Sequence, residues 1–332
     1  MNTKNQEPIQ VGLIGFGAWS REAYAPILNE FANVRVAAVA ARSESTLQLA
    51  RDTFKNDIIT TGNYRQLLQE DALDVLMIAI PNALHTQVLE DAAACGKHLF
   101  FEPPMALDAS KAATVFDKLS RCDDVVDTDL ELRCLPVIVA MQEHIDSGMV
   151  GAPRMARIRL ACDWGYTRGP WFDEVQHQSF FHWLGHWYLD TLDVIFKQPA
   201  ERACIVGGHA KNGRLMDHGW ASLVYPDGRL GQFEFNLIVP QGTVIDLSVT
   251  CERGQLHGNL QTGVWRHRGT SDDWYDAKAP ASQPAHGFEG MRESIWNFFE
   301  AVHHGRDPRG NLAVAHRVQH AAQLCANAES ST

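Results

Sequence analysis

The stretch VGLIGFGAWS, residues 11–20, decides how the first part of this chain folds. It begins as an apolar run typical of a buried strand, passes through two closely spaced glycines, and leads into a helical pattern from about Ser20. In that context a G-x-G sequence indicates a dinucleotide-binding loop. Gly15 would allow the tight turn, Gly17 would let the backbone approach a pyrophosphate, and Ser20 stands where a third glycine is usual. The alternative is a strand-to-helix turn without a ligand.

Short apolar runs and helical patterns alternate on either side of this loop, which predicts a parallel sheet covered on both faces. The expected strands lie at 9–14, 34–40, 58–60, 74–80, 98–101 and 125–128, with helices near 45–54 and 86–95. The sequence therefore predicts an α/β fold that begins with a doubly wound Rossmann domain at residues 1–123.

Residues 124–332 have a different pattern, in which apolar and polar residues alternate with a period of two. Such runs lie at 155–161, 203–206, 220–225, 230–239 and 243–250, and the turn Pro-Asp-Gly at 226–228 predicts a hairpin. Helices are expected near 136–147, 180–196, 290–303 and 312–326. We predict an α+β domain with a large, mainly antiparallel open-faced sheet that binds substrate and forms oligomers. Its last helices could pack back on the first domain.

Composition limits the classes of function. The 332 residues suggest two domains at roughly 150 residues each. A net charge of −11 argues against a nucleic-acid partner, which requires a basic face. The sequence contains no apolar run of about 20 residues and no apolar leader, so we expect neither a membrane partner nor secretion. Its seven cysteines are scattered without CxxC spacing, which favours free thiols and a cytoplasmic location.

The end of the second expected strand bears on the choice of dinucleotide. An acidic residue there would bind the ribose hydroxyls of NAD. This chain has Ala-Ala-Arg-Ser at 40–43, and Arg42 with Ser43 could hold a 2′-phosphate. We therefore favour NADP as the cofactor. NAD stays possible, because Glu44 could reach a ribose or Arg42 could be only a solvated loop residue.

Four motifs together resemble the glucose–fructose oxidoreductase, inositol dehydrogenase and MocA (Gfo/Idh/MocA) family. They are GFG at 15–17, IPNALH at 80–85, GKHLFFEPPMAL at 96–107 and SGMVGAPR at 147–154. The resemblance implies a Rossmann domain followed by an open-faced α/β domain. It also implies an NAD(P)-dependent oxidoreductase of sugars, polyols or related small molecules, active as a homodimer or homotetramer.

The residues predicted to contact the cofactor follow from the loop and from these motifs. They are Gly15, Phe16, Gly17, Ala18, Trp19, Arg42, Ser43, Pro81, Asn82, His85, Glu102 and Pro103. We expect His85 to pack near the cofactor loop without a chemical role.

The chain departs from the family first at residues 102–104. The family usually has Glu-Lys-Pro, whose lysine positions substrate and polarises the reacting oxygen, but here Pro103 follows Glu102. Proline has no side-chain proton and no charge. Biliverdin reductases of the same fold also lack this lysine, so its loss does not by itself abolish hydride transfer.

A second departure lies in the helix expected at 180–196, where the family usually has Asp-x-Gly-x-His-x-x-Asp. Alignment on Gly185 and Asp190 puts Trp183 in place of the first aspartate and Trp187 in place of the catalytic histidine. Alignment one residue earlier instead retains His186. The first register keeps more matches, and in it both usual acid–base groups are missing.

His182, His186 and Asp190 remain in this segment, spaced i, i+4 and i+8, which would put them on roughly one helical face. One interpretation is a catalytic face on which His186 donates the proton. A second is a metal site, although nothing supplies clear third and fourth ligands beyond Asp190, so we predict no metal. The third is a polar cleft wall or buried histidines whose hydrogen bonds are satisfied.

Other candidates would face the substrate. Arg133 matches a family position that often does so. Tyr166 could substitute as a proton donor, and Arg168 and Trp171 share its loop, which could overhang the nicotinamide. Trp187 would contribute an aromatic wall. For each of these the competing interpretation is ordinary structure.

We therefore predict an NADP-dependent oxidoreductase that transfers a hydride between nicotinamide and a carbonyl, a hydroxyl or a conjugated carbon. The tryptophans at 164, 171, 183 and 187 favour a substrate flatter or less polar than a simple polyol. Two alternatives stay open: an inactive regulator that senses the nucleotide, and a lyase or hydrolase that uses tightly bound NAD in a closed redox cycle.

Overall fold

A computed structural model describes residues 7–55, 58–164, 179–211, 215–240, 242–280 and 289–330. The chain forms two compact units. The first comprises residues 1–106, 110–129 and 284–315, and the second comprises 107–109, 130–283 and 316–332. The segment 284–315, which is late in the sequence, thus belongs to the first unit. The domain boundary at residue 123 stays a prediction. No helix in the described part of the chain is long and apolar enough to cross a bilayer.

The described residues of the first unit form a six-stranded sheet in the order β3-β2-β1-β4-β5-β6, with every pair parallel. The strands are β1 (Ile9–Ile14), β2 (Val34–Ala40), β3 (Ile59–Thr61), β4 (Val75–Ile78), β5 (His98–Phe101) and β6 (Val126–Thr128). The strand order reverses between β1 and β4, which is where ligands bind in open α/β sheets. The predicted doubly wound sheet is confirmed.

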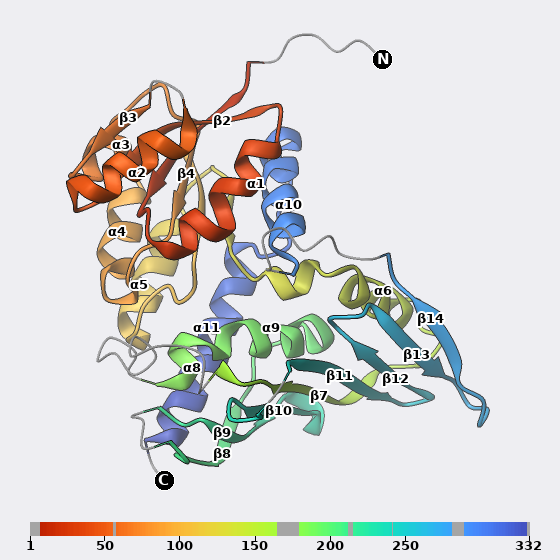
Figure 1. The fold of residues 1–332 in the computed structure, drawn as a ribbon. Helices are drawn as coiled ribbons and strands as arrows, with labels where there is room; N and C mark the ends of the chain where they lie inside the picture. Colours follow the sequence, from red (N-terminus) through yellow and green to blue (C-terminus); the bar gives the residue numbers. More distant parts are fainter. Residues whose placement is uncertain are drawn as a thin grey trace, which may run out of the picture. The chain divides into compact units, whose positions relative to one another are not determined.

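Helices cover both faces of this sheet. Buried side chains of α1 and α10, with Phe54 at the end of α2, meet one face, and those of α4 and α5 meet the other. Figure 1 shows α10, in blue, beside α1. The helical elements are η1 (Ser20–Tyr24), α1 (Ala25–Glu30), α2 (Glu44–Phe54), α3 (Arg65–Leu68), η2 (Asn82–Leu84), α4 (His85–Ala92), α5 (Ala109–Leu119) and α10 (Met291–His304).

The strands of the first sheet end level with one another. One row of paired residues crosses the sheet, namely Ala40, Ile14, Ile78, Phe101 and Thr128. The ladder continues one residue further, because the next four backbone N–H groups each donate to a carbonyl of the neighbouring strand; they belong to Gly15, Ala79, Glu102 and Asp129. Side chains at these four positions therefore share one edge of the sheet.

The described residues of the second unit form an eight-stranded sheet in the order β14-β13-β12-β11-β7-β10-β9-β8. All its pairs are antiparallel except β7 with β10. The strands are β7 (Pro153–Ala161), β8 (Arg202–Gly208), β9 (His218–Val224), β10 (Leu230–Asn236), β11 (Val244–Cys251), β12 (Gly254–Asn259), β13 (Val264–Arg268) and β14 (Tyr275–Lys278). The predicted mainly antiparallel sheet is confirmed, and the hairpin turn at 226–228 joins β9 to β10.

One face of the second sheet carries its hydrophobic core. The helical elements of this unit are η3 (Glu131–Cys134), α6 (Pro136–Asp146), α8 (Phe180–Trp183), α9 (Gly185–Phe196) and most of α11 (Leu312–Glu329). Phe180 of α8 stacks on Phe235 of β10, and Tyr188 of α9 stacks on Phe233. Side chains on the opposite face are half-buried or exposed, which matches the expected open face.

The single helix expected at 180–196 is wrong. The segment forms two helices, and Leu184 stands between them with φ −103° and ψ −21°. His182 therefore lies on α8, while His186 and Asp190 lie on α9. Sequence periodicity missed the break because φ and ψ at Leu184 depart only modestly from helical values.

Candidate functional site

A cavity of about 350 Å³ opens at the carboxyl end of β1 in the first unit. Its lining comes from the glycine loop, the end of β2, the loop before α3 and the segment that follows β4. Of the residues predicted to contact the cofactor, six take part: Gly15, Phe16, Gly17, Arg42, Ser43 and Pro81. This is the switch-point crevice in which a dinucleotide is expected.

The glycine loop fits a pyrophosphate. Gly15 has φ +95°, and a Cβ there would lie 2.0 Å from the carbonyl oxygen of Ala79, so glycine is required for both reasons. A Cβ at Gly17 would meet no atom within 4 Å among the described residues, and Gly17 lines the cavity. The Ser20 hydroxyl donates to the Gly15 carbonyl at 2.9 Å. The residue in the third-glycine position thus holds the loop in place.

The end of β2 carries one positive charge toward the cavity. Arg42 is exposed and lines the cavity, and Ser43 caps α2 by accepting a hydrogen bond from Thr46 N at 3.1 Å. Glu44, the acidic residue nearest in sequence, forms an ion pair with Arg51. The local acid is therefore engaged by a cation, while Arg42 faces the space that a ligand would occupy.

The other residues predicted to contact the cofactor lie outside the cavity lining, as far as the structure describes the chain. Ala18 and Trp19 follow the glycine loop, Asn82 begins η2, and Pro103 follows β5. His85 is fully buried, with its ring nitrogens 2.8 Å from Ile80 O and 2.6 Å from Pro104 O. Burial lowers the pKa of His85. As expected, it supports the loop after β4; contact of these residues with a cofactor stays a prediction.

Glu102 is the centre of a buried polar network in the first unit. The Trp19 indole N–H donates to Glu102 Oε1 at 2.5 Å, and the Tyr24 hydroxyl donates to the same oxygen. Asp129 is fully buried beside them and accepts a hydrogen bond from the Ser294 hydroxyl at 3.1 Å. Sequence reasoning missed Tyr24, Asp129 and Ser294.

Burial raises the pKa of Asp129 to about 7, although hydrogen bonds with Glu102, Ser294 and Tyr24 oppose the shift. Burial therefore favours the protonated form of a carboxyl group that would ordinarily be ionised at neutral pH. A carboxyl that titrates in this range can accept or release a proton during a reaction.

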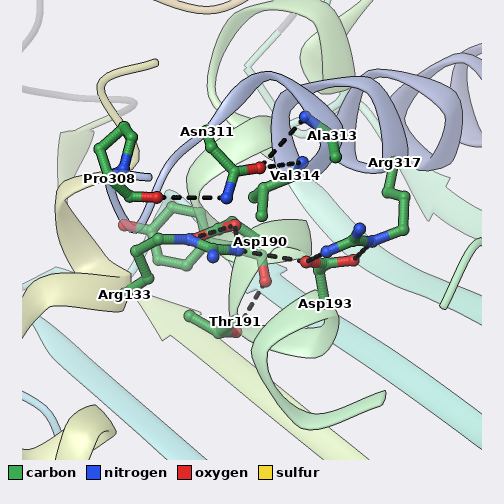
Figure 2. A network of polar contacts seen from close by, with 10 residues as sticks. Arg133, Asp190, Thr191, Asp193, Pro308, Asn311, Ala313, Val314 and Arg317 are labelled. Carbon is green, nitrogen blue, oxygen red and sulfur yellow. Dashed lines mark hydrogen bonds and ion pairs between the residues drawn. The ribbon is translucent and has the colours of Figure 1, made fainter. Parts of the chain in front are cut away.

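The second unit holds a buried ionic network (Figure 2), which brings the predicted Arg133 and Asp190 together. Arg133 Nε lies 3.0 Å and 3.1 Å from the two carboxylate oxygens of Asp190, and its Nη2 lies 3.2 Å from Asp193 Oδ2. Arg317 donates to both oxygens of Asp193, at 2.6 Å and 2.9 Å. Asp193 and Arg317 were missed by sequence reasoning.

The charged side chains of this network shift one another's pKa values. Burial lowers the pKa of Arg133, but Asp190 and Asp193 outweigh it and hold the net value above the ordinary range. Burial also raises the pKa of Asp190 to about 6, with Arg133 opposing the shift. Two arginines face two carboxylates here, so the geometry is that of an ion-pair cluster. Roles for Arg133 and Asp190 toward substrate stay predictions.

The remaining predicted residues are placed as follows. His182 and His186 are buried, with 3% and 1% of their surface exposed, and burial lowers the pKa of His182. Trp187 packs partly buried against the core. Tyr166, Arg168 and Trp171 lie outside the described residues. Within the described ranges, no group of three or more His, Cys, Asp or Glu side chains is arranged to hold a metal ion.

Comparison with known proteins identifies two family domains. Residues 9–129 match the oxidoreductase family with an NAD-binding Rossmann fold, and residues 138–257 match the Gfo/Idh/MocA C-terminal domain. An inositol 2-dehydrogenase/D-chiro-inositol 3-dehydrogenase of Lacticaseibacillus casei is 23% identical over 255 residues, which cover 75% of this chain and 71% of that protein.

Two further comparisons concern levoglucosan dehydrogenase. The enzyme of Pseudarthrobacter phenanthrenivorans is 27% identical over 165 residues, which cover 47% of this chain and 42% of that protein. A solved levoglucosan dehydrogenase in complex with NADH and levoglucosan has the same fold, with a TM-score of 0.86 and 16% identity over 98% of both chains. With the cavity and the glycine loop, these matches establish that the chain belongs to the Gfo/Idh/MocA family of NAD(P)-dependent oxidoreductases.

Proposed function

We propose that this chain is an NADP-dependent dehydrogenase that oxidises a hydroxyl group of a sugar or polyol, or reduces the corresponding carbonyl. The observation that carries the choice of cofactor is the cavity end formed by Arg42 and Ser43. A guanidinium binds a 2′-phosphate by charge-assisted hydrogen bonds, whereas a ribose diol calls for a carboxylate. Glu44 is engaged by Arg51, which argues against the carboxylate mode.

Replacement of Arg42 tests the choice of cofactor. We expect Arg42→Ala to weaken NADP⁺ binding by at least tenfold, because a hydrogen bond to a charged group contributes about 1.5–3 kcal/mol, and to leave NAD⁺ binding within about twofold. Fluorescence titration with both nucleotides measures this ratio. Arg121→Ala, which removes an exposed arginine from the same unit outside the cavity lining, is the control. Equal loss of affinity for both nucleotides would contradict the proposed phosphate contact.

The proposed substrate class rests on the names of the relatives. These include inositol, levoglucosan and D-xylose dehydrogenases. Trp183 is one of the four tryptophans that favoured a flatter substrate. It packs in the core against Phe180, and a core position does not argue for a flat substrate, so a sugar is more consistent with the structure. The test is NADP⁺ reduction measured with myo-inositol, levoglucosan and D-xylose. Conversion of a sugar without net reduction, with the nucleotide retained, would indicate a closed redox cycle instead.

Two groups compete for the proton that accompanies hydride transfer, because Pro103 replaces the usual lysine. His186 is the first sequence-based candidate, and Tyr166 is the sequence-based substitute for it. Turnover measured for His186→Ala and for Tyr166→Phe separates the two alternatives, and turnover that survives both substitutions would contradict them.

We further propose that the chain forms a homodimer or homotetramer through the open face of the second sheet. Apolar side chains on this face are exposed: Val206 by 62%, Met155 by 53%, Trp220 by 50% and Leu230 by 44%. Strand pairing places Leu230 beside Met155 and Trp220 beside Val206. Exposed apolar surface of this kind marks interaction sites.

Substitutions on the open face test the oligomer. We expect Trp220→Glu combined with Met155→Glu to reduce the molar mass measured by light scattering to that of one chain. Leu49→Glu, a matched change at an exposed leucine of the first unit, should leave the mass unchanged. A wild-type protein that sediments as a single chain would contradict the proposal.

A cytoplasmic location is proposed from the cysteines. All seven are free thiols, and four of them are buried in the second unit or at its edge, namely Cys134, Cys162, Cys251 and Cys325. Free thiols persist in reducing compartments. Thiol titration of protein purified from a cytoplasmic extract should count seven reactive groups after denaturation.

A further inference from the structure

Part of the dinucleotide cavity is formed neither by the glycine loop nor by the end of β2. It is lined by Tyr64 just before α3, by Leu84 of η2, and by Gln87 and Val88 of α4. The proposed function puts the pyrophosphate at the glycine loop and the 2′-phosphate at Arg42. The base of the nucleotide is then left with this remaining lining, which we call the base pocket.

Helix α4 brings the polar members of the base pocket together. Gln87 and Asp91 are four residues apart on α4, so their side chains lie on one face of the helix. The Tyr64 hydroxyl donates a hydrogen bond of 2.6 Å to Asp91 Oδ2, and Arg65 Nη2 lies 2.6 Å from the same oxygen. Asp91 thus holds the Tyr64 side chain on the same side of the cavity as Gln87.

The Tyr64 ring gives a planar base a fixed apolar wall. Its hydroxyl is bound by Asp91, and Arg65 Cζ lies 4.9 Å from the ring centre. Burial and the hydrogen bond to Asp91 raise the pKa of Tyr64 to about 12, which keeps the phenol neutral near pH 7. Leu84, which is 37% exposed, and the buried Val88 add further apolar surface. Such a lining, with few polar groups, is typical of a pocket for a flat ligand.

Gln87 supplies a free polar group in this pocket. The hydroxyls of Ser43 and Thr46, which also line the cavity, lie 2.7 Å apart, and the Tyr64 hydroxyl is bound to Asp91. The exposed Gln87 carboxamide forms no hydrogen bond within the described part of the chain. A carboxamide carries an acceptor and a donor in one plane. It can therefore accept from the 6-amino group of adenine while it donates to N7.

We propose that Gln87 recognises the adenine base of the dinucleotide by this bidentate contact, and that Tyr64 is the wall against which the base packs. This inference rests on the proposed use of NADP, but it concerns the base and not the phosphate. In hypoxanthine an oxygen replaces the 6-amino group, and that oxygen would face the carboxamide oxygen of Gln87. A dinucleotide that carries hypoxanthine is therefore bound more weakly, and Gln87 is a specificity-determining residue for the cofactor.

Calorimetric titration with two nucleotides that differ only in the base tests the role of Gln87. The probes are NADP⁺ and nicotinamide hypoxanthine dinucleotide phosphate. We expect the full-length wild-type protein to bind NADP⁺ about fivefold or more tightly than the hypoxanthine nucleotide, which is the discrimination that one bidentate contact provides. In Gln87→Leu the two affinities should come within about twofold of each other. A merely structural role of Gln87 would change both affinities and leave their ratio unchanged.

Three further variants complete the experiment. Gln69→Leu is the matched control, because Gln69 is an exposed glutamine of the same unit outside the described cavity lining, and it should keep the wild-type ratio. Tyr64→Phe should also keep the ratio, since the lost hydroxyl was bound to Asp91. Tyr64→Leu should weaken the binding of both nucleotides by a similar factor, because packing against a ring does not depend on the group at position 6. Unchanged affinities in Tyr64→Leu would overturn the role of Tyr64.

Two results would overturn the role of Gln87. One is equal affinity of the wild-type protein for the two nucleotides, and the other is a wild-type ratio in a Gln87→Leu variant that circular dichroism shows to be folded. The same titrations with NAD⁺ and nicotinamide hypoxanthine dinucleotide separate the base from the phosphate. A protein that prefers NAD⁺ and still discriminates between the bases would contradict the proposed role of Arg42 and support that of Gln87. Failure to bind any of the four nucleotides would overturn both.

Discussion

At the scale of single residues, the two loop glycines have different physical roles. Gly15 has a positive φ and no room for a Cβ, whereas Gly17 has room but borders the cavity. The first is required by the fold, whereas the second is predicted to be required by the ligand. The sequence motif identified both glycines, but only the structure distinguishes their roles.

This distinction predicts different outcomes for two alanine substitutions. Gly15→Ala should lower the melting temperature and abolish nucleotide binding, because alanine is strained at positive φ and its Cβ would overlap the Ala79 carbonyl. Gly17→Ala should leave the melting temperature within about 2 °C while weakening NADP⁺ binding at least tenfold, because the methyl would occupy the approach of the pyrophosphate. Calorimetry and fluorescence titration measure the two quantities. A stable, nucleotide-binding Gly15→Ala variant would contradict the geometry of the loop.

The residues of the candidate site differ in how far sequence could locate them. Arg42 was located because it directly follows a recognisable strand. Asp129 follows β6 in the same way, and the rule that functional groups lie at carboxyl ends of parallel strands would have identified it. It was missed because it lies between the family motifs at 96–107 and 147–154. Tyr24 and Ser294 could not be found from sequence, since only packing brings η1 and α10 to the same carboxyl pair.

At the scale of elements, α9 is fixed by a buried ion-pair cluster. Asp190 and Asp193 on α9 face Arg133 of η3 and Arg317 of α11. Removing one partner of a buried ion pair leaves an uncompensated buried charge. The free-energy cost of that charge exceeds the stabilisation that the intact pair provides. The helix, the turn before α6 and the last helix are therefore energetically coupled.

This coupling predicts that Asp190→Asn lowers the free energy of unfolding by about 3 kcal/mol, because Arg133 loses its bidentate partner. Chemical denaturation monitored by circular dichroism measures the change. Asp146→Asn is a matched control, since it removes the exposed partner of Lys197 and should cost less than about 1 kcal/mol. Equal effects of the two substitutions would contradict a special role for the buried cluster.

The elements that sequence missed include the helices α3 and α5 and the strands β12, β13 and β14 at one end of the second sheet. The residues of these strands include Gly254, His257, Arg266 and His267, which are not typical of strands with one apolar face. Aromatic and cationic contacts replace apolar alternation there: Arg266 and Arg268 lie 4.6 Å and 5.0 Å from the ring centre of Trp274. Such contacts join distant positions, so periodicity within one strand does not reveal them.

At the scale of the whole molecule, the buried carboxyl group makes stability depend on pH. The pKa of Asp129 is raised to about 7 from its ordinary value of 3.8. The protonated form is thus favoured in the folded state. Its contribution to stability is fully present below about pH 4 and is lost as the pH rises through 7.

Asp129→Asn should therefore be more stable than the wild type at pH 8 and equally stable at pH 4. The expected gain at pH 8 exceeds about 1.4 kcal/mol, which corresponds to one pKa unit. Urea denaturation at both pH values measures the difference. Asp123→Asn, a substitution at an exposed position near the same strand, serves as the control. A wild-type advantage that grows with pH would contradict the raised pKa.

The level row of strand ends in the first sheet has a consequence for the evolution of proteins with this fold. Backbone hydrogen bonds, and not side chains, hold Gly15, Ala79, Glu102 and Asp129 in line. Except at Gly15, where there is no room for a Cβ, side chains at this edge can therefore be exchanged during evolution at little cost to the ladder. Chemistry at this edge can therefore change while the architecture of the sheet is inherited intact.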